Sequence, residues 1–180
     1  VQTGLGRTGA LFAYQNSDVV PAGVVPDVMS IAKGLGNGLP IGAILARAEI
    51  ADLIHPGDHA STFGGGAVPC QAALAVLHQL TPSLLSDVER LGTLIRREIS
   101  GWSGEMPFIK EVRGVGLMIG VELDRPGAEV VPYALAKGLL VNCTANTVIR
   151  LLPPFVLSRR ETMRGLSILK SVLKTFGDPS

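Results

Sequence analysis

Between residues 30 and 43 the chain reads Ser30-Ile31-Ala32-Lys33-Gly34-Leu35-Gly36-Asn37-Gly38-Leu39-Pro40-Ile41-Gly42-Ala43, with one lysine between an apolar run and closely spaced glycines. Short apolar runs bounded by turn residues are typical of buried strands, so we expect strands over 28–32 and 41–46. A lysine amine is normally protonated at neutral pH, with a pKa of about 10.4. Desolvation or a nearby positive charge lowers such a pKa, and the neutral amine then forms a Schiff base with an aldehyde or ketone. Lys33 is therefore either a reactive amine or a solvated lysine at a turn.

The composition indicates an ordered globular protein. Of the 180 residues, 47% are hydrophobic and 17% are charged, which favours a buried core over disorder. The net charge of +1 gives no reason to expect a nucleic-acid partner. No apolar run approaches the ~20 residues that span a bilayer, and no signal peptide is apparent, so we expect no membrane partner and a cytoplasmic location.

Cysteine and histidine usage predicts neither a disulfide framework nor a metal site. Cys70 and Cys143 are too few for such a framework in a chain of this size, and a reducing compartment is the simplest interpretation. His55 and His59 form a near pair, with only Asp58 at ligand spacing.

Periodicity and turn residues predict a chain in which strands and helices alternate. Expected helices cover 48–54, 71–80, a range from Thr81 or Ser83 to Ile99, 129–137 and 159–176. Further strands are expected over 109–112, 117–123, 139–142 and 148–152. This alternation implies a layered α/β architecture. A break in the pattern over 100–107 divides the chain into a segment 1–103 and a smaller α+β segment 104–180.

Two glycine-containing motifs allow more than one interpretation. Residues 4–9 satisfy G-x-G-x-x-G and Asp27 follows at a suitable distance, but the preceding strand and following helix of a dinucleotide site are missing, which leaves an oxidoreductase as a distant alternative. Ser61 and Thr62 precede three glycines and a helix. Their hydroxyls suit either an anion site at the helix start or an N-cap within a flexible loop.

Arg150 lies near the end of an apolar strand, between Val148-Ile149 and Leu151-Leu152-Pro153-Pro154. An arginine in such a place needs a partner, and a planar guanidinium matches a carboxylate. The local sequence supports a structural salt bridge and a clamp for a substrate carboxylate equally.

Six segments in this order resemble the class III pyridoxal-phosphate aminotransferases. They are VQTGLGRTG (1–9), PD (26–27), AKGLGNGLPIG (32–42), STFGG (61–65), VRGVGL (112–117) and VIRLLPP (148–154). The likeness covers nearly the whole chain and is closest to acetylornithine aminotransferases, through LLVN (139–142). It implies a fold-type I transferase, with 1–103 as part of the large cofactor-binding domain and 104–180 as the C-terminal small domain.

The resemblance also implies roles for individual residues. Lys33 would bind pyridoxal phosphate covalently as a Schiff base and then transfer protons. Val1 would pack on the cofactor ring, and Gln2 would bond its phenolic oxygen. Thr62 would bind the cofactor phosphate across a dimer interface. Arg150 would hold the substrate α-carboxylate, with Ser61 also on the substrate side.

This chain departs from the family pattern in two places. Gly66-Ala67 stands where Asn-Pro usually follows the Phe-Gly-Gly stretch, which suggests a looser loop. The chain starts at Val1 without a methionine, so we expect it to be the C-terminal part of a longer protein. The aspartate that the family pairs with the pyridinium nitrogen would lie two positions before Val1.

The function implied by the resemblance is an aminotransferase of arginine biosynthesis. It would move the amino group of N-acetylornithine, or of a related ω-amino acid, to 2-oxoglutarate as a homodimer. The alternative is a truncated, non-catalytic remnant or dimerisation module of such an enzyme.

Overall fold

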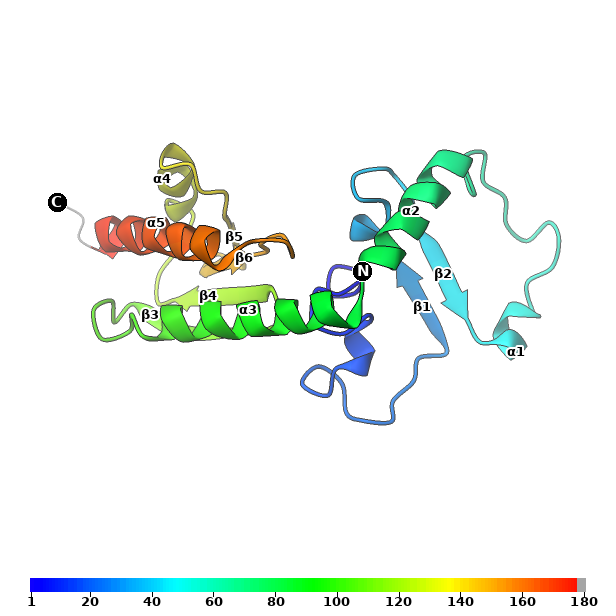
Figure 1. The fold of residues 1–180 in the computed structure, drawn as a ribbon, viewed down its shortest axis with the longest axis horizontal. Coiled ribbons are helices and arrows are strands. Elements are labelled where there is room, and N and C mark those ends of the chain that lie inside the picture. The colour runs from blue at the N-terminus through cyan, green and yellow to red at the C-terminus, as the bar shows by residue number, and fades with distance from the viewer. Residues whose placement is uncertain (178–180) are drawn as a thin grey trace. The chain divides into compact units, whose positions relative to one another are not determined.

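The structure is a computed structural model that describes residues 1–177. The chain forms two compact units, Val1–Leu85 and the described residues from Ser86 onward (Figure 1). Its first elements are η1 (Ala13–Gln15), β1 (Val28–Ile31), η2 (Lys33–Gly36), β2 (Ala43–Ala46), α1 (Ala48–Ala51) and α2 (Ala67–Gln79). The later elements are α3 (Pro82–Ser100), β3 (Ile109–Val115), β4 (Met118–Leu123), α4 (Val130–Ala136), β5 (Asn142–Thr144), β6 (Val148–Leu151) and α5 (Arg159–Gly177).

The first unit has a small core. Strands β1 and β2 pair antiparallel, with Ile31 opposite Ala43, and together they form a two-stranded sheet. The buried cluster consists of Leu5, Leu35 and Ala73. Ile44 on β2 is 73% exposed, so apolar surface of this sheet lies open.

The second unit is built on a four-stranded antiparallel sheet in the order β3-β4-β6-β5. Along β4 the residues alternate in burial, because successive side chains of a strand point to opposite faces. Ile119, Val121 and Leu123 face a core that also contains buried side chains of α3, α4 and α5. This unit therefore has the α+β character expected for the C-terminal part of the chain.

Helix α3 begins as its sequence predicts. The backbone N–H of Leu84 donates to the Thr81 hydroxyl at 3.3 Å, which identifies Thr81 as the capping residue instead of Ser83. Pro82 follows at the first helical position, where its missing N–H costs no hydrogen bond. The division between the two compact units falls at the first turn of this helix, earlier than residue 103.

Several elements differ from the sequence prediction. Helix α1 ends at Ala51 instead of residue 54, and strand β3 continues to Val115 instead of residue 112. Helix α2 begins at Ala67, before the expected residue 71, because Pro69 falls within its first turn, where proline is tolerated. The strand expected over 139–142 is wrong: β5 covers Asn142–Thr144. The apolar residues before it connect α4 to the strand, and the N–H of Leu139 bonds back to the carbonyl of Ala134.

Candidate active site

Lys33 lies at the junction of β1 and η2. Ala32 is extended with φ −167°, and Lys33 itself has φ 55°, in the left-handed region. In this turn Leu35 and Gly36 are buried, whereas Lys33 is exposed. A non-glycine residue in this region is uncommon, and such residues gather at functional sites. The turn thus fixes the backbone of Lys33 and leaves the residue exposed.

The N-terminal segment shares a core with the lysine turn. Leu5 packs with Leu35 and Ala73, so the loop that follows Gln2 and the turn that carries Lys33 are attached to the same cluster. Val1 is 53% exposed and Gln2 is half-buried. The packing of Val1 on a cofactor ring and the hydrogen bond of Gln2 to its phenolic oxygen stay predictions.

Ser61 and Thr62 lie in the loop between α1 and α2, and both are exposed. Helix α2 has Gly66 as its N-cap, without a side-chain hydrogen bond to its first turn. The interpretation of Ser61 or Thr62 as an N-cap is therefore wrong, because the helix starts several residues later.

Arg150 belongs to β6 in the second unit. Its direct cross-strand neighbours are Gly120 on β4 and Asn142 on β5, so the three share one face of the sheet. The Nε of Arg150 donates to the Oδ1 of Asn142 at 3.3 Å. Sequence inspection missed this partner, because the pairing of β5 with β6 is not visible in local sequence.

A cavity of about 480 Å³ lies beside the strand that carries Arg150. Its walls are mainly apolar and come from the connection before β5, the segment after β6 and the first half of α5. Leu139, Leu140 and Val141, which the sequence assigned to a strand, line it.

The family profile "Aminotransferase class-III" matches residues 1–173. The chain belongs to this family. The acetylornithine aminotransferase of Caldanaerobacter subterraneus subsp. tengcongensis is 46% identical over 175 residues, which are 96% of this chain and 43% of that protein. The acetylornithine aminotransferase of Aquifex aeolicus is 44% identical over 173 residues, 96% of this chain and 43% of that protein. The chain thus spans less than half the length of these relatives.

Solved structures of acetylornithine and ornithine aminotransferases share the fold. The acetylornithine aminotransferase of Elizabethkingia anophelis superimposes with a TM-score of 0.88 at 34% identity, over 98% of this chain and 46% of that one. The ornithine aminotransferase of Toxoplasma gondii gives a TM-score of 0.87 at 34% identity, over 98% of this chain and 42% of that one. The expected fold class, part of a fold-type I pyridoxal-phosphate-dependent transferase, is confirmed.

Class-III aminotransferases depend in general on pyridoxal phosphate, and the chemistry of the residues in the first unit fits this group. Lys33 offers an exposed amine on a fixed turn, which suits an aldehyde. No side chain caps the first turn of α2, and the loop before it carries the exposed hydroxyls of Ser61 and Thr62. Free backbone N–H groups and hydroxyls at a helix start suit a phosphate. The side-chain chemistry of Lys33 and Thr62 is compatible with such a cofactor.

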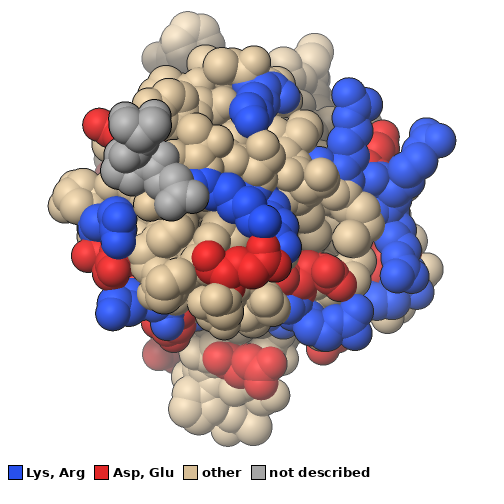
Figure 2. All heavy atoms as spheres, turned by 90° about the vertical axis from the view of Figure 1, so that its left-hand side faces the viewer, with Lys and Arg blue, Asp and Glu red and all other residues tan. Residues whose placement is uncertain are grey.

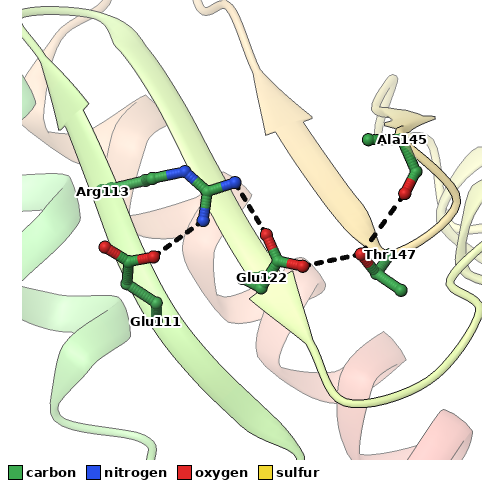
Figure 3. Close-up of polar contacts among 5 residues, drawn as sticks. All are labelled: Glu111, Arg113, Glu122, Ala145 and Thr147. Carbon is green, nitrogen blue, oxygen red and sulfur yellow. Dashed lines mark hydrogen bonds and ion pairs between the residues drawn. The ribbon is translucent and has the colours of Figure 1, made fainter.

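Arg113 lies on the same sheet face as Arg150 but has different partners. Gly120 pairs with both arginines, one on each side. Arg113 donates to Glu111 at 2.9 Å and to Glu122 at 2.7 Å, and Glu122 also accepts from the Thr147 hydroxyl at 2.7 Å (Figure 3). The Thr147 hydroxyl and then Arg113 lower the pKa of Glu122 below its usual value. Arg113 is a structural residue that links strands β3 and β4.

The dinucleotide interpretation of residues 4–9 is wrong. The segment forms turns, with Leu5 at φ 56°, Gly6 at φ 89° and Gly9 at φ 83°. No helix opens at its third glycine, because the next helical element, η1, begins only at Ala13. Burial in this loop lowers the pKa of the Arg7 guanidinium.

The described residues contain neither a metal-binding cluster nor a membrane-spanning helix. Residues 1–177 contain no group of three His, Cys, Asp or Glu side chains arranged to hold a metal ion. None of the helices within that range is long and apolar enough to cross a membrane.

Proposed function

We propose that this chain is part of a pyridoxal-phosphate-dependent transaminase that moves the amino group of N-acetylornithine, or of a related ω-amino acid, to 2-oxoglutarate in arginine biosynthesis. The observation that carries the proposal is Lys33, held at a left-handed φ of 55° in a turn whose Leu35 is buried against the N-terminal loop. The names of the relatives support the choice of substrate.

The proposed roles follow from the chemistry of each side chain. Pyridoxal phosphate, when bound, supplies an electron sink for the carbon that carries the transferred amino group. The Nζ of Lys33 attaches the cofactor and then takes up and returns the proton at that carbon. Val1 covers the cofactor ring, and Gln2 donates a hydrogen bond to its phenolic oxygen. These two residues hold the ring in place beside Lys33.

The remaining proposed residues bind anionic groups. Thr62 binds the cofactor phosphate of the partner subunit in a homodimer, and Ser61 assists on the substrate side. Arg150 holds the substrate carboxylate with its planar guanidinium. In this proposal residues 1–103 belong to the large domain and 104–180 form the small domain of a cytoplasmic enzyme.

Covalent attachment of the cofactor tests this function. The complete gene product that contains these 180 residues is incubated with pyridoxal phosphate, reduced with borohydride and digested. We expect mass spectrometry to find the adduct on Lys33, and to find none there after Lys33→Ala. Lys110→Ala, which removes an exposed lysine of β3, is the matched control and should keep the adduct.

A second measurement separates the two hypotheses for the chain. Wild-type protein should transfer the amino group of N-acetylornithine to 2-oxoglutarate, and Lys33→Ala should abolish this transfer. A folded, self-associating protein with neither an adduct on Lys33 nor amino transfer would contradict the proposal and favour the non-catalytic dimerisation module.

A further inference from the structure

The turn that carries Lys33 is attached to the first unit through two buried residues, Leu35 and Gly36. Lys33 and Gly34, at the start of the same turn, are exposed. The backbone of Lys33 is left-handed, with φ 55°. A non-glycine residue keeps this sterically unfavourable conformation only where the surrounding structure determines it. The constraint on Lys33 must therefore come from the residues that the turn buries.

Leu35 anchors the turn to two other segments of the first unit. It is 3% exposed and lies in a cluster with Leu5 and Ala73. Leu5 belongs to the N-terminal loop, and Ala73 lies on helix α2, which packs against η2. One apolar cluster thus holds the turn, the N-terminal loop and α2 together. A change in the size of Leu35 alters where the turn lies relative to both neighbours.

Gly36 allows a close approach within the turn. A Cβ at this position would lie 2.8 Å from the Cγ2 of Ile41, closer than real Cβ contacts. Ile41 packs against the same cluster, and its β-branched side chain has few alternative rotamers. A side chain at position 36 would therefore displace the turn. Gly34 differs, because a Cβ there would meet no atom within 4 Å, and neither glycine has a left-handed φ.

We propose that Leu35 and Gly36 are positioning residues, which hold the backbone of Lys33 so that its amine meets the aldehyde of pyridoxal phosphate. This inference rests on the proposed transaminase function. In the attachment step the neutral Nζ of Lys33 adds to the aldehyde carbon, a C=N bond replaces the C=O bond, and water leaves. A displacement of about 1 Å can slow a reaction between held groups by roughly a hundredfold. Leu35 and Gly36 act through Lys33, since their own contacts are with the cluster and with Ile41.

The test measures covalent attachment and one half-reaction in the complete gene product. Protein freed of cofactor is mixed with pyridoxal phosphate, reduced with borohydride at successive times and digested, and mass spectrometry follows the adduct on Lys33. In the reloaded protein, the half-reaction with N-acetylornithine gives a maximum rate and an apparent Kd for this donor. We expect Gly36→Ala to lower the attachment rate and the maximum rate by at least about tenfold. The donor Kd should stay within about threefold of wild type, because the turn positions the reacting amine and not the groups that bind the donor.

Three further variants serve as controls. Gly34→Ala adds the same methyl group to the same turn and should keep both rates near wild type. Leu35→Ala should resemble Gly36→Ala, whereas Leu35→Met should restore both rates to within about threefold of wild type, because it conserves the packed volume. Leu173→Ala removes the same atoms from the core of the second unit, so it should lower the melting temperature and leave both rates near wild type.

The outcomes separate this inference from the proposed function. If wild type carries the adduct on Lys33 but Gly36→Ala matches Gly34→Ala in both rates, the positioning role is overturned and the transaminase function stands. Rate losses in Leu173→Ala as large as those in Leu35→Ala also overturn it, because the rates would then follow stability alone. Wild-type protein with no adduct on Lys33 and no amino transfer overturns the proposed function, and the positioning role with it.

Discussion

Gly92 lies where helix α3 passes the turn between β3 and β4. A Cβ at this position would overlap the carbonyl oxygen of Gly116, which belongs to the backbone and cannot rotate away. We therefore expect Gly92→Ala to lower the free energy of unfolding by about 2–3 kcal/mol, because the helix must move away from the sheet. Urea unfolding measures this change.

Gly104→Ala is the control for this substitution. Its Cβ would meet no atom within 4 Å, so its effect should stay within about 0.5 kcal/mol. Equal stability of the two variants would show that α3 does not approach the turn as closely as the structure has it.

At the residue scale, the sequence singles out a residue where a reactive type of side chain stands in an unusual local context. Lys33 stands out because a lone amine among glycines is unusual, and the structure adds the left-handed backbone that these neighbours allow. The partners of Arg150 and Arg113 could not be predicted in the same way. Which side chains share a row depends on strand register, and register is set by long-range pairing.

At the element scale, the cap of α3 gives a direct test. Thr81→Ala removes the hydroxyl that accepts from the N–H of Leu84 and should destabilise the protein by about 1 kcal/mol. Ser83→Ala, inside the first turn, removes a hydroxyl of the same kind without loss of that bond and should have a smaller effect. The midpoints of urea unfolding compare the stability of the two variants. A larger loss in Ser83→Ala would mean that the helix begins later than Pro82.

An ion-pair cluster joins the loop after α3 to α5. Lys170 and Lys174 contact Glu105 at 2.8 Å and 2.7 Å, and their hydrogen bonds lower the pKa of Glu105 from 4.5 to about 2. A carboxyl whose pKa is lower in the folded state stabilises the fold above its unfolded pKa, and this contribution disappears as the pH falls through the folded pKa. We expect stability from Glu105 to be present above about pH 4.5 and to be lost toward pH 2.

Glu105→Gln tests this pH dependence. The variant should be less stable than wild type at neutral pH, and the difference should shrink as the pH falls from 4.5 toward 2. Thermal unfolding across this range measures it, with Glu89→Gln on α3 as the exposed control. A difference that stays constant with pH would mean that the two lysines do not bind Glu105 in solution.

Most helices were predictable because their apolar spacing and caps act locally, as in α3 and α5. The strand placed over 139–142 was wrong because Leu139, Leu140 and Val141 are apolar for another reason. They line the cavity beside Arg150. Apolar sequence alone does not distinguish a strand from an irregular segment that borders a cavity.

At the scale of the whole chain, the two units differ in how much apolar surface they bury. In the described residues the first unit has the buried cluster Leu5, Leu35 and Ala73, whereas the core of the second unit draws on α3, α4, α5 and three of its strands. Phe63 in the first unit is 92% exposed. Acidic and basic side chains lie intermixed on the face shown in Figure 2, which includes the surface of the second unit. The second unit thus buries a larger apolar cluster than the first within the described residues.

This contrast predicts unequal protection from hydrogen exchange along the chain. Backbone amides of Val121, Ile149 and Val172 lie in regular elements with fully buried side chains, and they should open only with global unfolding of the second unit. Amides of Met29 and Leu45 in the β1–β2 pair have few buried neighbours and should exchange faster by at least about tenfold. Exchange followed by mass spectrometry on the 180-residue chain measures both sets. Slower exchange in the complete gene product, confined to the first unit, would show that the rest of that protein completes its core. Equal protection of both units in the 180-residue chain would contradict the prediction, because the small cluster around Leu35 would then suffice to hold the turn of Lys33.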